Sequence, residues 1–287
     1  MASIVFFGSG PVAAASLDYI SKKFDIEAVI TKTVPPHHKH TAPVEELAKQ
    51  LKLPIRFANT KKELDETIAQ NHLTSRIGLL VDYGVIVSQQ VIDSFELGIV
   101  NSHFSLLPQW RGADPITFSI LSGQPKTGVS IMLIDSGLDT GKLLTQKNIK
   151  INPDETSTSL TKRLVELSNS LLSEYIPRYQ SGEIKPKNQP HPDRATYSRK
   201  LTKADGLIDF QKPAEQIERE VRAFAGWPKS RATINNVSVI VTKSHVTEKK
   251  IDELDVLCVD GEYLSIDELV APSGKSMSAA AFINGYF

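Results

Sequence analysis

Two polar residues within a short apolar run have the types and spacing that could act on a carbonyl group. Asn101 and His103 lie two residues apart in the run IVNSH, so in a strand both side chains point to one face. An amide and an imidazole on one face can hydrogen-bond a developing oxyanion and move a proton. A histidine at a strand end often has only a structural role, so this pair leaves both interpretations open.

A third candidate, Asp139, lies in the segment SGLDTG, a loop bracketed by glycines after the next predicted strand. A carboxylate there could reach an imidazole on a neighbouring strand and orient it or stabilise its charge. The same pattern is also typical of a turn with a capping Asp. If the three residues do meet, we expect them at the carboxyl end of a strand, where open α/β sheets bind ligands.

Strands and helices alternate along the chain around these residues, which predicts an α/β domain with a doubly wound sheet. The predicted strands cover residues 3–7, 26–30, 55–57, 77–81, 99–103 and 128–133. The predicted helices cover residues 12–21, 44–51, 61–69, 87–95, 115–121 and 157–176, the last of which we expect to end at Pro177.

The composition changes at residues 181–203, which are rich in Pro, Lys and Arg and have little periodicity. After them come a predicted helix over 214–225 and short strand-like runs over 232–234, 237–241, 255–259 and 263–270. Short strands separated by frequent turns predict a small barrel or sandwich. We therefore expect a catalytic domain over 1–182, a basic linker over 183–203 and a second domain over 204–287.

The overall composition excludes several classes of protein. Lys and Arg number 33, as do Asp and Glu, which excludes a uniformly basic nucleic-acid binder. The one cysteine, Cys258, excludes an internal disulfide and a multi-cysteine metal site. No apolar run is long enough for a membrane helix, and the N-terminus lacks the basic region of a signal peptide. We expect a soluble cytoplasmic protein that does not bind a membrane.

The segment from Gly8 to Ala13 matches the G-x-G-x-x-A pattern of dinucleotide-binding proteins. That pattern also needs an acidic residue after the second strand to bind the ribose, and the segment from Ile30 to Thr33 has none. We interpret the glycines as a tight turn between strand and helix. Three further histidines, His37, His38 and His40, could bind a metal, but an exposed loop explains them as well, and we expect no metal.

The motifs NSH (101–103), SLLP (105–108), WRGA (110–113) and GLDTG (137–141) together closely resemble the formyltransferase family that uses 10-formyltetrahydrofolate. Asp139 follows His103 by 36 residues, as in that family. The resemblance implies that Asn101, His103 and Asp139 are the catalytic residues and that 10-formyltetrahydrofolate is the formyl donor. It also implies a Rossmann-like catalytic domain followed by an OB-type β-barrel.

The resemblance extends to a donor-binding region. The segment YGVI is similar to the loop that lies against the pterin ring in the family. The residues implied for folate binding are Tyr83, Gly84, Val85, Ile86, Ser105, Leu106, Leu107 and Pro108.

Later segments resemble the branch of the family that formylates methionyl-tRNA, notably residues 195–201, 208–210, 221–224 and 227–228. This resemblance implies initiator methionyl-tRNA as the acceptor and a monomeric enzyme. The residues implied for tRNA binding are Arg111, Arg199, Lys200 and Lys203. In the implied reaction the acceptor amine attacks the formyl carbon, Asn101 and a protonated His103 stabilise the oxyanion, and Asp139 orients His103. Whether His103 or Asp139 takes the proton stays open.

Two features depart from that branch and keep further acceptors open. The loop over 34–43 is short and has a single lysine, and residues 204–287 carry 9 Lys and Arg against 13 Asp and Glu. Phosphate binding normally requires positive charge, so these features favour a sugar-nucleotide N-formyltransferase. The sequence is also compatible with a formyltetrahydrofolate hydrolase, in which water replaces the amine, and with a non-catalytic folate- or tRNA-binding module.

Overall fold

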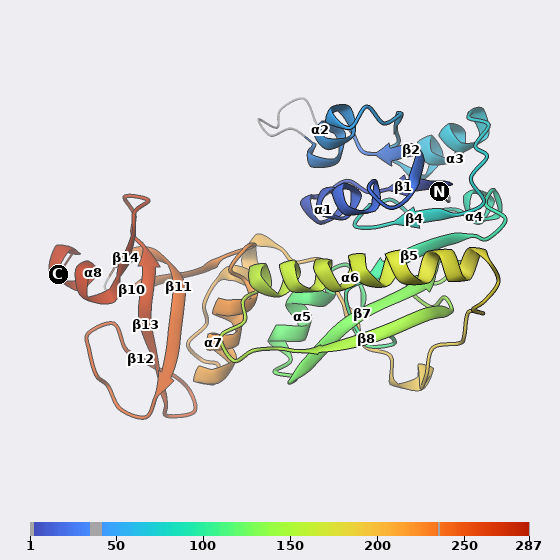
Figure 1. Cartoon of the computed structure of the whole chain (residues 1–287). Helices are drawn as coiled ribbons and strands as arrows, with labels where there is room; N and C mark the ends of the chain where they lie inside the picture. The colour runs from blue at the N-terminus through green and yellow to red at the C-terminus, as the bar shows by residue number, and fades with distance from the viewer. Residues whose placement is uncertain (1–2, 35–41, 235, 287) are drawn as a thin grey trace. The chain divides into compact units, whose positions relative to one another are not determined.

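The structure is a computed structural model, which describes residues 3–34, 42–234 and 236–286 (Figure 1). Its contacts divide the chain into two compact units that are not consecutive in sequence. The first unit comprises Met1–Gly112, Gly128–Ile149 and Lys162–Tyr197, and the second comprises Ala113–Thr127, Lys150–Thr161 and Ser198–Phe287. The domain boundaries expected from composition stay a prediction.

The first unit is built on a seven-stranded sheet with the order β3-β2-β1-β4-β5-β7-β8. The strands in that order are Ile55–Phe57, Asp25–Thr31, Ser3–Phe7, Gly78–Leu80, Ile99–His103, Lys126–Leu133 and Leu143–Lys150. The pairs from β3 to β5 are parallel, whereas β5 and β7 are antiparallel. Parallel strands that alternate with helices confirm the predicted doubly wound, Rossmann-like fold.

Five helices accompany these strands: α1 (Pro11–Ile20), α2 (Pro43–Gln50), α3 (Lys61–Gln70), α4 (Gln89–Asp93) and α6 (Ser157–Gln180). The helices α3 and α4 share a buried core with one face of the sheet, which includes Phe7 and Ile99. On the other face, Ser102 hydrogen-bonds Ser168 of α6 at 2.6 Å. Because side chains alternate along a strand, Asn101 and His103 lie on the face opposite α6.

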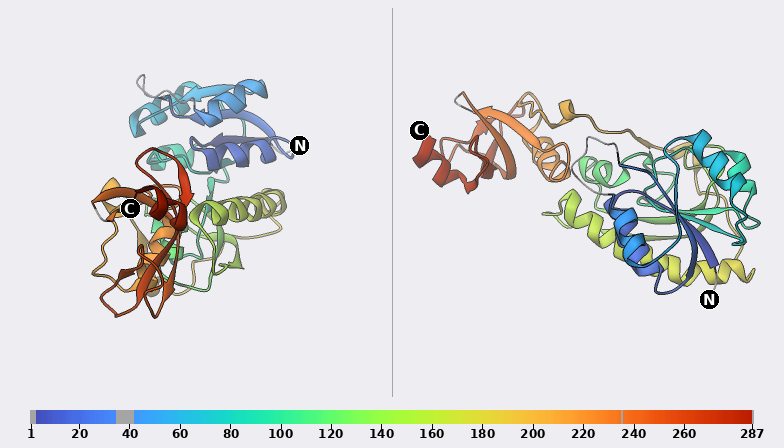
Figure 2. Two further views of the ribbon diagram at one scale, coloured as in Figure 1. Left: turned by 90° about the vertical axis from the view of Figure 1, so that its left-hand side faces the viewer. Right: turned by 90° about the horizontal axis from the view of Figure 1, so that it is seen from above.

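The predicted end of the long helix at Pro177 is wrong, because α6 continues to Gln180. Both views of Figure 2 show α6 as one long, continuous yellow-green helix. A proline inside a helix loses the hydrogen bond of its missing N–H, but the following turn still forms: Ser181 N–H donates to the Pro177 carbonyl at 3.0 Å. The buried side chains Leu160, Leu164, Leu172 and Ile176 hold the helix in place. Packing therefore outweighs the local cost of the proline.

The second unit contains an antiparallel sheet with the order β10-β11-β13-β12, in which β14 also pairs with β13. These strands are β10 (Ser230–Ile234), β11 (Val237–Thr247), β12 (Val256–Leu257), β13 (Tyr263–Val270) and β14 (Ser276–Ser278). The pairing of β11 with β13 shifts register twice between Val241 and Ser244, and such bulges bend a sheet. The curled sheet agrees with the predicted OB-type domain.

Helices α5 (Pro115–Leu121), α7 (Ala214–Ala223) and α8 (Ala279–Tyr286) complete the second unit. The strands β8 and β14 and the helix α8 were not predicted. Since β8 is mostly polar and β14 has three residues, neither shows a clear apolar period.

The basic segment expected to be a linker makes defined contacts. Lys187 exchanges two backbone hydrogen bonds with Leu143 of β8, and β9 (Tyr197–Ser198) pairs with β6 (Arg111–Gly112). Among the described residues, no helix combines the length and apolar character needed to cross a membrane. No group of metal-ligating side chains occurs in this part of the chain, and the three histidines of 37–40 lie outside it.

Candidate active site

The strand β5, which lies inside the sheet between β4 and β7, positions Asn101 and His103 near its carboxyl end. Asn101 lies opposite Leu80 of the parallel strand β4, and His103 lies opposite Ser130 of the antiparallel strand β7. Both side chains are buried. The paired strands β4 and β7, one on each side, hold β5 in place. Asn101 and His103 therefore share one face of the sheet, as the sequence predicted.

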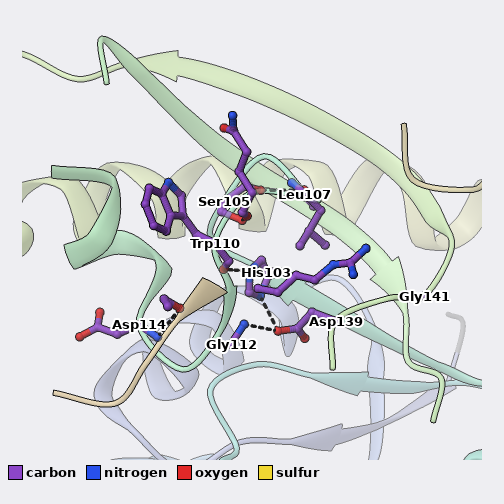
Figure 3. A network of polar contacts seen from close by, with 12 residues as sticks. His103, Ser105, Leu107, Trp110, Gly112, Asp114, Asp139 and Gly141 are labelled. Atoms are coloured by element: carbon purple, nitrogen blue, oxygen red, sulfur yellow. Dashed lines mark hydrogen bonds and ion pairs between the residues drawn. The ribbon is translucent and has the colours of Figure 1, made fainter. Parts of the chain in front are cut away.

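The His103 ring lies between a backbone carbonyl and a carboxylate (Figure 3). Its Nε2 is 2.9 Å from the carbonyl oxygen of Trp110, and its Nδ1 is 3.7 Å from Oδ2 of Asp139. A carbonyl can only accept, so Nε2 carries the hydrogen that is donated to Trp110. The neutral ring then presents a lone pair on Nδ1 toward Asp139.

Burial lowers the pKa of His103 below its usual value of 6.5, and the positive charge of Arg111 acts in the same direction. The Asp139 carboxylate and the Trp110 carbonyl oppose the shift without cancelling it. The lowered pKa favours a neutral imidazole in the free protein at pH 7. It favours a cation that forms during the reaction, and the protonated His103 implied by the resemblance stays a prediction.

The Asp139 carboxylate is held by the backbone that follows β5. Its Oδ2 accepts a hydrogen bond of 2.7 Å from the N–H of Gly112 (Figure 3). Asp139 has a φ of 52°, a left-handed conformation that is uncommon for residues other than glycine. Gly141 closes the loop, because a Cβ there would lie 1.7 Å from the carbonyl oxygen of Leu133. The glycine thus allows a close backbone approach that keeps Asp139 beside His103.

Gln189 also holds this loop, a role that no sequence pattern predicted. Its Nε2 donates to the carbonyl oxygens of Asp139 at 2.7 Å and Gly141 at 3.0 Å. Its Oε1 accepts a bond of 2.7 Å from the guanidinium of Arg111. Gln189 lies in the segment interpreted as a linker, where no periodic pattern marks a buried residue.

Arg111 was expected to bind tRNA, yet only 6% of it is exposed. Its guanidinium contacts Gln189 inside the first unit. This arrangement supports a role in positioning the Asp139 loop, and the assignment to tRNA stays a prediction.

The Asn101 amide forms no hydrogen bond with any side chain or backbone group of residues 3–34, 42–234 and 236–286. Its donor group is therefore available to an oxygen of a bound substrate.

The predicted pterin loop begins at the carboxyl end of β4, beside β5. The ring of Tyr83 is buried against Phe7, and its hydroxyl donates to the carbonyl of Ala58 at 2.9 Å. Ile86, in contrast, is 76% exposed. Tyr83 thus anchors the loop, while the Gly84 backbone and the Ile86 side chain remain accessible to a ligand.

The segment from Ser105 to Pro108 is tied to the sheet. The N–H of Leu107 donates to Oγ of Ser130, which in turn donates to the Ser105 carbonyl at 2.6 Å. Ser105 and Leu107 are buried. The side chains of these two residues support the site from within, and their role in folate binding stays a prediction.

The other residues expected to bind tRNA lie in the second unit. Arg199, Lys200 and Lys203 are exposed. Arg199 forms a bidentate ion pair with Asp205, and this pair lowers the pKa of Asp205. Part of the positive charge expected for phosphate binding is therefore neutralised within the protein.

The first unit thus brings together a hydrogen-bond donor, a neutral imidazole and a carboxylate. The amide of Asn101 can stabilise an oxyanion, and Nδ1 of His103 can accept a proton. Asp139 can then stabilise the imidazolium that forms. This set is suited to the attack of an amine or water on a carbonyl carbon.

Comparisons with known proteins agree with this chemistry. Residues 1–176 match the formyl transferase family, and residues 200–286 match the formyl transferase C-terminal domain. A methionyl-tRNA formyltransferase of Myxococcus xanthus is 34% identical over 99% of this chain and 95% of its own length. A second, from Pelobacter propionicus, is 32% identical over 99% of this chain and 93% of its own length.

Among solved structures, an N-formyltransferase of Helicobacter canadensis in complex with folinic acid and dTDP-3-aminofucose superposes with a TM-score of 0.71. It is 21% identical and covers 93% of this chain and 99% of its own. Its likeness concerns the fold. With family matches in both parts of the sequence and full-length relatives above 30% identity, the chain belongs to the formyl transferase family.

Proposed function

We propose that this protein transfers a formyl group from 10-formyltetrahydrofolate to the amino group of methionyl-tRNA, giving formylmethionyl-tRNA for translation initiation. The observation that carries the proposal is the match with methionyl-tRNA formyltransferases over 99% of the chain, at 34% and 32% identity. The match includes the second unit as well as the catalytic one. Folinic acid in the complex of the Helicobacter canadensis neighbour supports a folate as the donor.

The catalytic step follows from the three polar groups of the site. The acceptor amine adds to the formyl carbon, and the Asn101 amide donates a hydrogen bond to the resulting oxyanion. Nδ1 of neutral His103 accepts the proton of the amine, and the Asp139 carboxylate stabilises the imidazolium. The same proton can then pass to the folate nitrogen as its bond to the formyl carbon breaks. The cation on His103 is transient, consistent with its lowered pKa.

The tRNA would contact exposed cations of the second unit, of which Lys200 and Lys203 are candidates. Arg199 could take part only with its charge shared with Asp205. We further expect the enzyme to act as a monomer in the cytoplasm, where translation takes place.

A second candidate acceptor, an amino-sugar nucleotide, has specific support. The structural neighbours include N-formyltransferases that act on sugars, and the second unit has more acidic than basic residues. However, the N-formyltransferase of Helicobacter canadensis is only 21% identical to this chain, whereas the methionyl-tRNA formyltransferase of Myxococcus xanthus is 34% identical. Methionyl-tRNA is therefore the better supported acceptor.

The experiment supplies the purified protein with 10-formyltetrahydrofolate and one of three acceptors: methionyl-tRNA, an amino-sugar nucleotide or water. We expect formylation of methionyl-tRNA only. Asn101→Ala and His103→Ala should each lower kcat by about 10²-fold or more. His245→Ala is the matched control, because His245 also contacts a carboxylate, Asp267, at 2.9 Å, but does so in the second unit. Formylation of the sugar alone would reject the proposal.

A further inference from the structure

The second unit exposes a tryptophan among cationic residues, a combination that the catalytic mechanism does not use. Trp227 and Leu207 are both 57% exposed. They lie in segments that also contain Lys203, Lys229 and Arg231. We call these five residues the Trp227 surface.

The two segments that form this surface pack closely against each other. A Cβ on Gly206 would lie 2.1 Å from the carbonyl oxygen of Lys229 and 3.1 Å from the ring of Pro228. The N–H of Ile208 donates to the Arg231 carbonyl at 2.9 Å. The segment around Leu207 therefore runs directly beside the segment from Trp227 to Arg231, which leads into β10.

Charge at this surface differs from that of the rest of the unit. Four neighbouring cations are paired with carboxylates: Arg199 with Asp205, Lys212 with Glu220, Arg219 with Glu215 and Arg222 with Glu218. Among the described residues, no carboxylate lies within ion-pair distance of Lys203, Lys229 or Arg231.

The acidic residues of the unit gather elsewhere. Of the 13 Asp and Glu residues after position 203, eight lie between residues 248 and 268. The net negative charge that argued against tRNA binding thus belongs to another part of the sheet. The Trp227 surface is locally positive.

An exposed indole beside cations fits one class of ligand particularly well. Nucleic-acid bases stack on aromatic side chains whatever their sequence, while Lys and Arg neutralise the adjacent phosphates. A double helix offers phosphates but no free base face, so the indole selects for an unpaired nucleotide.

We propose that the Trp227 surface binds an unpaired nucleotide of methionyl-tRNA. The indole of Trp227 stacks on the base. The flanking phosphates are contacted by Lys203, Lys229 and Arg231. This inference rests on the proposed formylation of methionyl-tRNA. Of the predicted set of Arg111, Arg199, Lys200 and Lys203, it keeps Lys203 and adds Trp227, Lys229 and Arg231.

The test measures steady-state formylation of methionyl-tRNA by the full-length protein. Trp227→Ala should raise KM for methionyl-tRNA at least about fivefold, the lower end expected for loss of one stacked base. Trp227→Phe should recover most of that loss, because it keeps an aromatic face. The kcat and the KM for the folate donor should stay within about twofold, a separation that a general folding defect would not produce.

The cations are tested through salt dependence. The double variant Lys203→Gln, Lys229→Gln should reduce the slope of log(kcat/KM) against log[salt] by about 1.4–1.8, at 0.7–0.9 per phosphate contact. Lys249→Gln with Lys250→Gln is the matched control, since both are exposed lysines of the same unit. Ile251→Ala, at a residue that is 71% exposed, is the control for Trp227→Ala.

The outcomes separate the two proposals. If the wild type does not formylate methionyl-tRNA, the proposed function fails. If it does, but both Trp227 variants and the double Lys variant match their controls, only the present inference is overturned. A change in oligomeric state by sedimentation with unchanged KM would also overturn it, since the surface would then bind protein.

Discussion

Gln189 offers the sharpest test of how the catalytic carboxylate is held. Replacing it with leucine, of similar size, removes the acceptor of the Arg111 guanidinium and both donations to the carbonyls of Asp139 and Gly141. At about 1 kcal/mol for each buried hydrogen bond, and more for the one with a charged partner, the free energy of unfolding should fall by about 3–4 kcal/mol.

The catalytic effect should accompany this loss but differ from it in origin. With its loop released, Asp139 can move from its position 3.7 Å from Nδ1 of His103. A displacement of about 1 Å typically costs about 10²-fold in rate, so we expect kcat to fall by about 10- to 100-fold. Because Asp139 raises the pKa of His103, its withdrawal should also shift the acid limb of the kcat/KM profile to lower pH.

The assay combines urea unfolding with formylation kinetics from pH 5 to 8. Gln189→Glu is the companion variant: it keeps an oxygen for Arg111 but removes the donor to the two carbonyls. It should lose kcat as Gln189→Leu does. If Gln189→Leu has wild-type kcat and an unchanged acid limb, Gln189 does not position Asp139, and the reasoning is refuted.

Three further predictions follow from the geometry. Activity should require neutral His103, so the midpoint of the acid limb of kcat/KM should lie below pH 6.5. Asp139→Asn should move this midpoint to still lower pH, because Asp139 raises the pKa of His103. An acid limb with a midpoint above pH 6.5 would contradict the lowered pKa. Gly141→Ala should lower the free energy of unfolding by about 1–3 kcal/mol and reduce kcat, because its Cβ would meet the Leu133 carbonyl at 1.7 Å. Chemical denaturation measures the loss, and Gly226→Ala is the control, because a Cβ there would come no closer than 3.7 Å to another atom. Folinic acid should raise the melting temperature whereas NAD should not, and stabilisation by NAD alone would restore the dinucleotide interpretation of the Gly8 turn.

Much of the fold and part of the site could be predicted from local patterns in the sequence. The common face of Asn101 and His103 follows from the two-residue period of a strand, and the strand itself from the apolar run in which they lie. The alternation of strands and helices likewise predicted the sheet of the first unit. These features depend on residues close together in sequence, so they can be predicted without packing.

The protonation state and the support of the site depend on packing. Gln189 lies 78 residues from Arg111 and 50 from Asp139, and no local pattern in its segment marks it as buried. The lowered pKa of His103 follows from burial and from the charge of Arg111, whereas the Trp110 carbonyl fixes which ring nitrogen carries the hydrogen. That carbonyl belongs to a residue with a left-handed backbone, since Trp110 has a φ of 56°. Sequence patterns determine which side chains share a face, whereas desolvation and long-range hydrogen bonds exist only once the units are folded, so the tertiary structure alone decided how the site works.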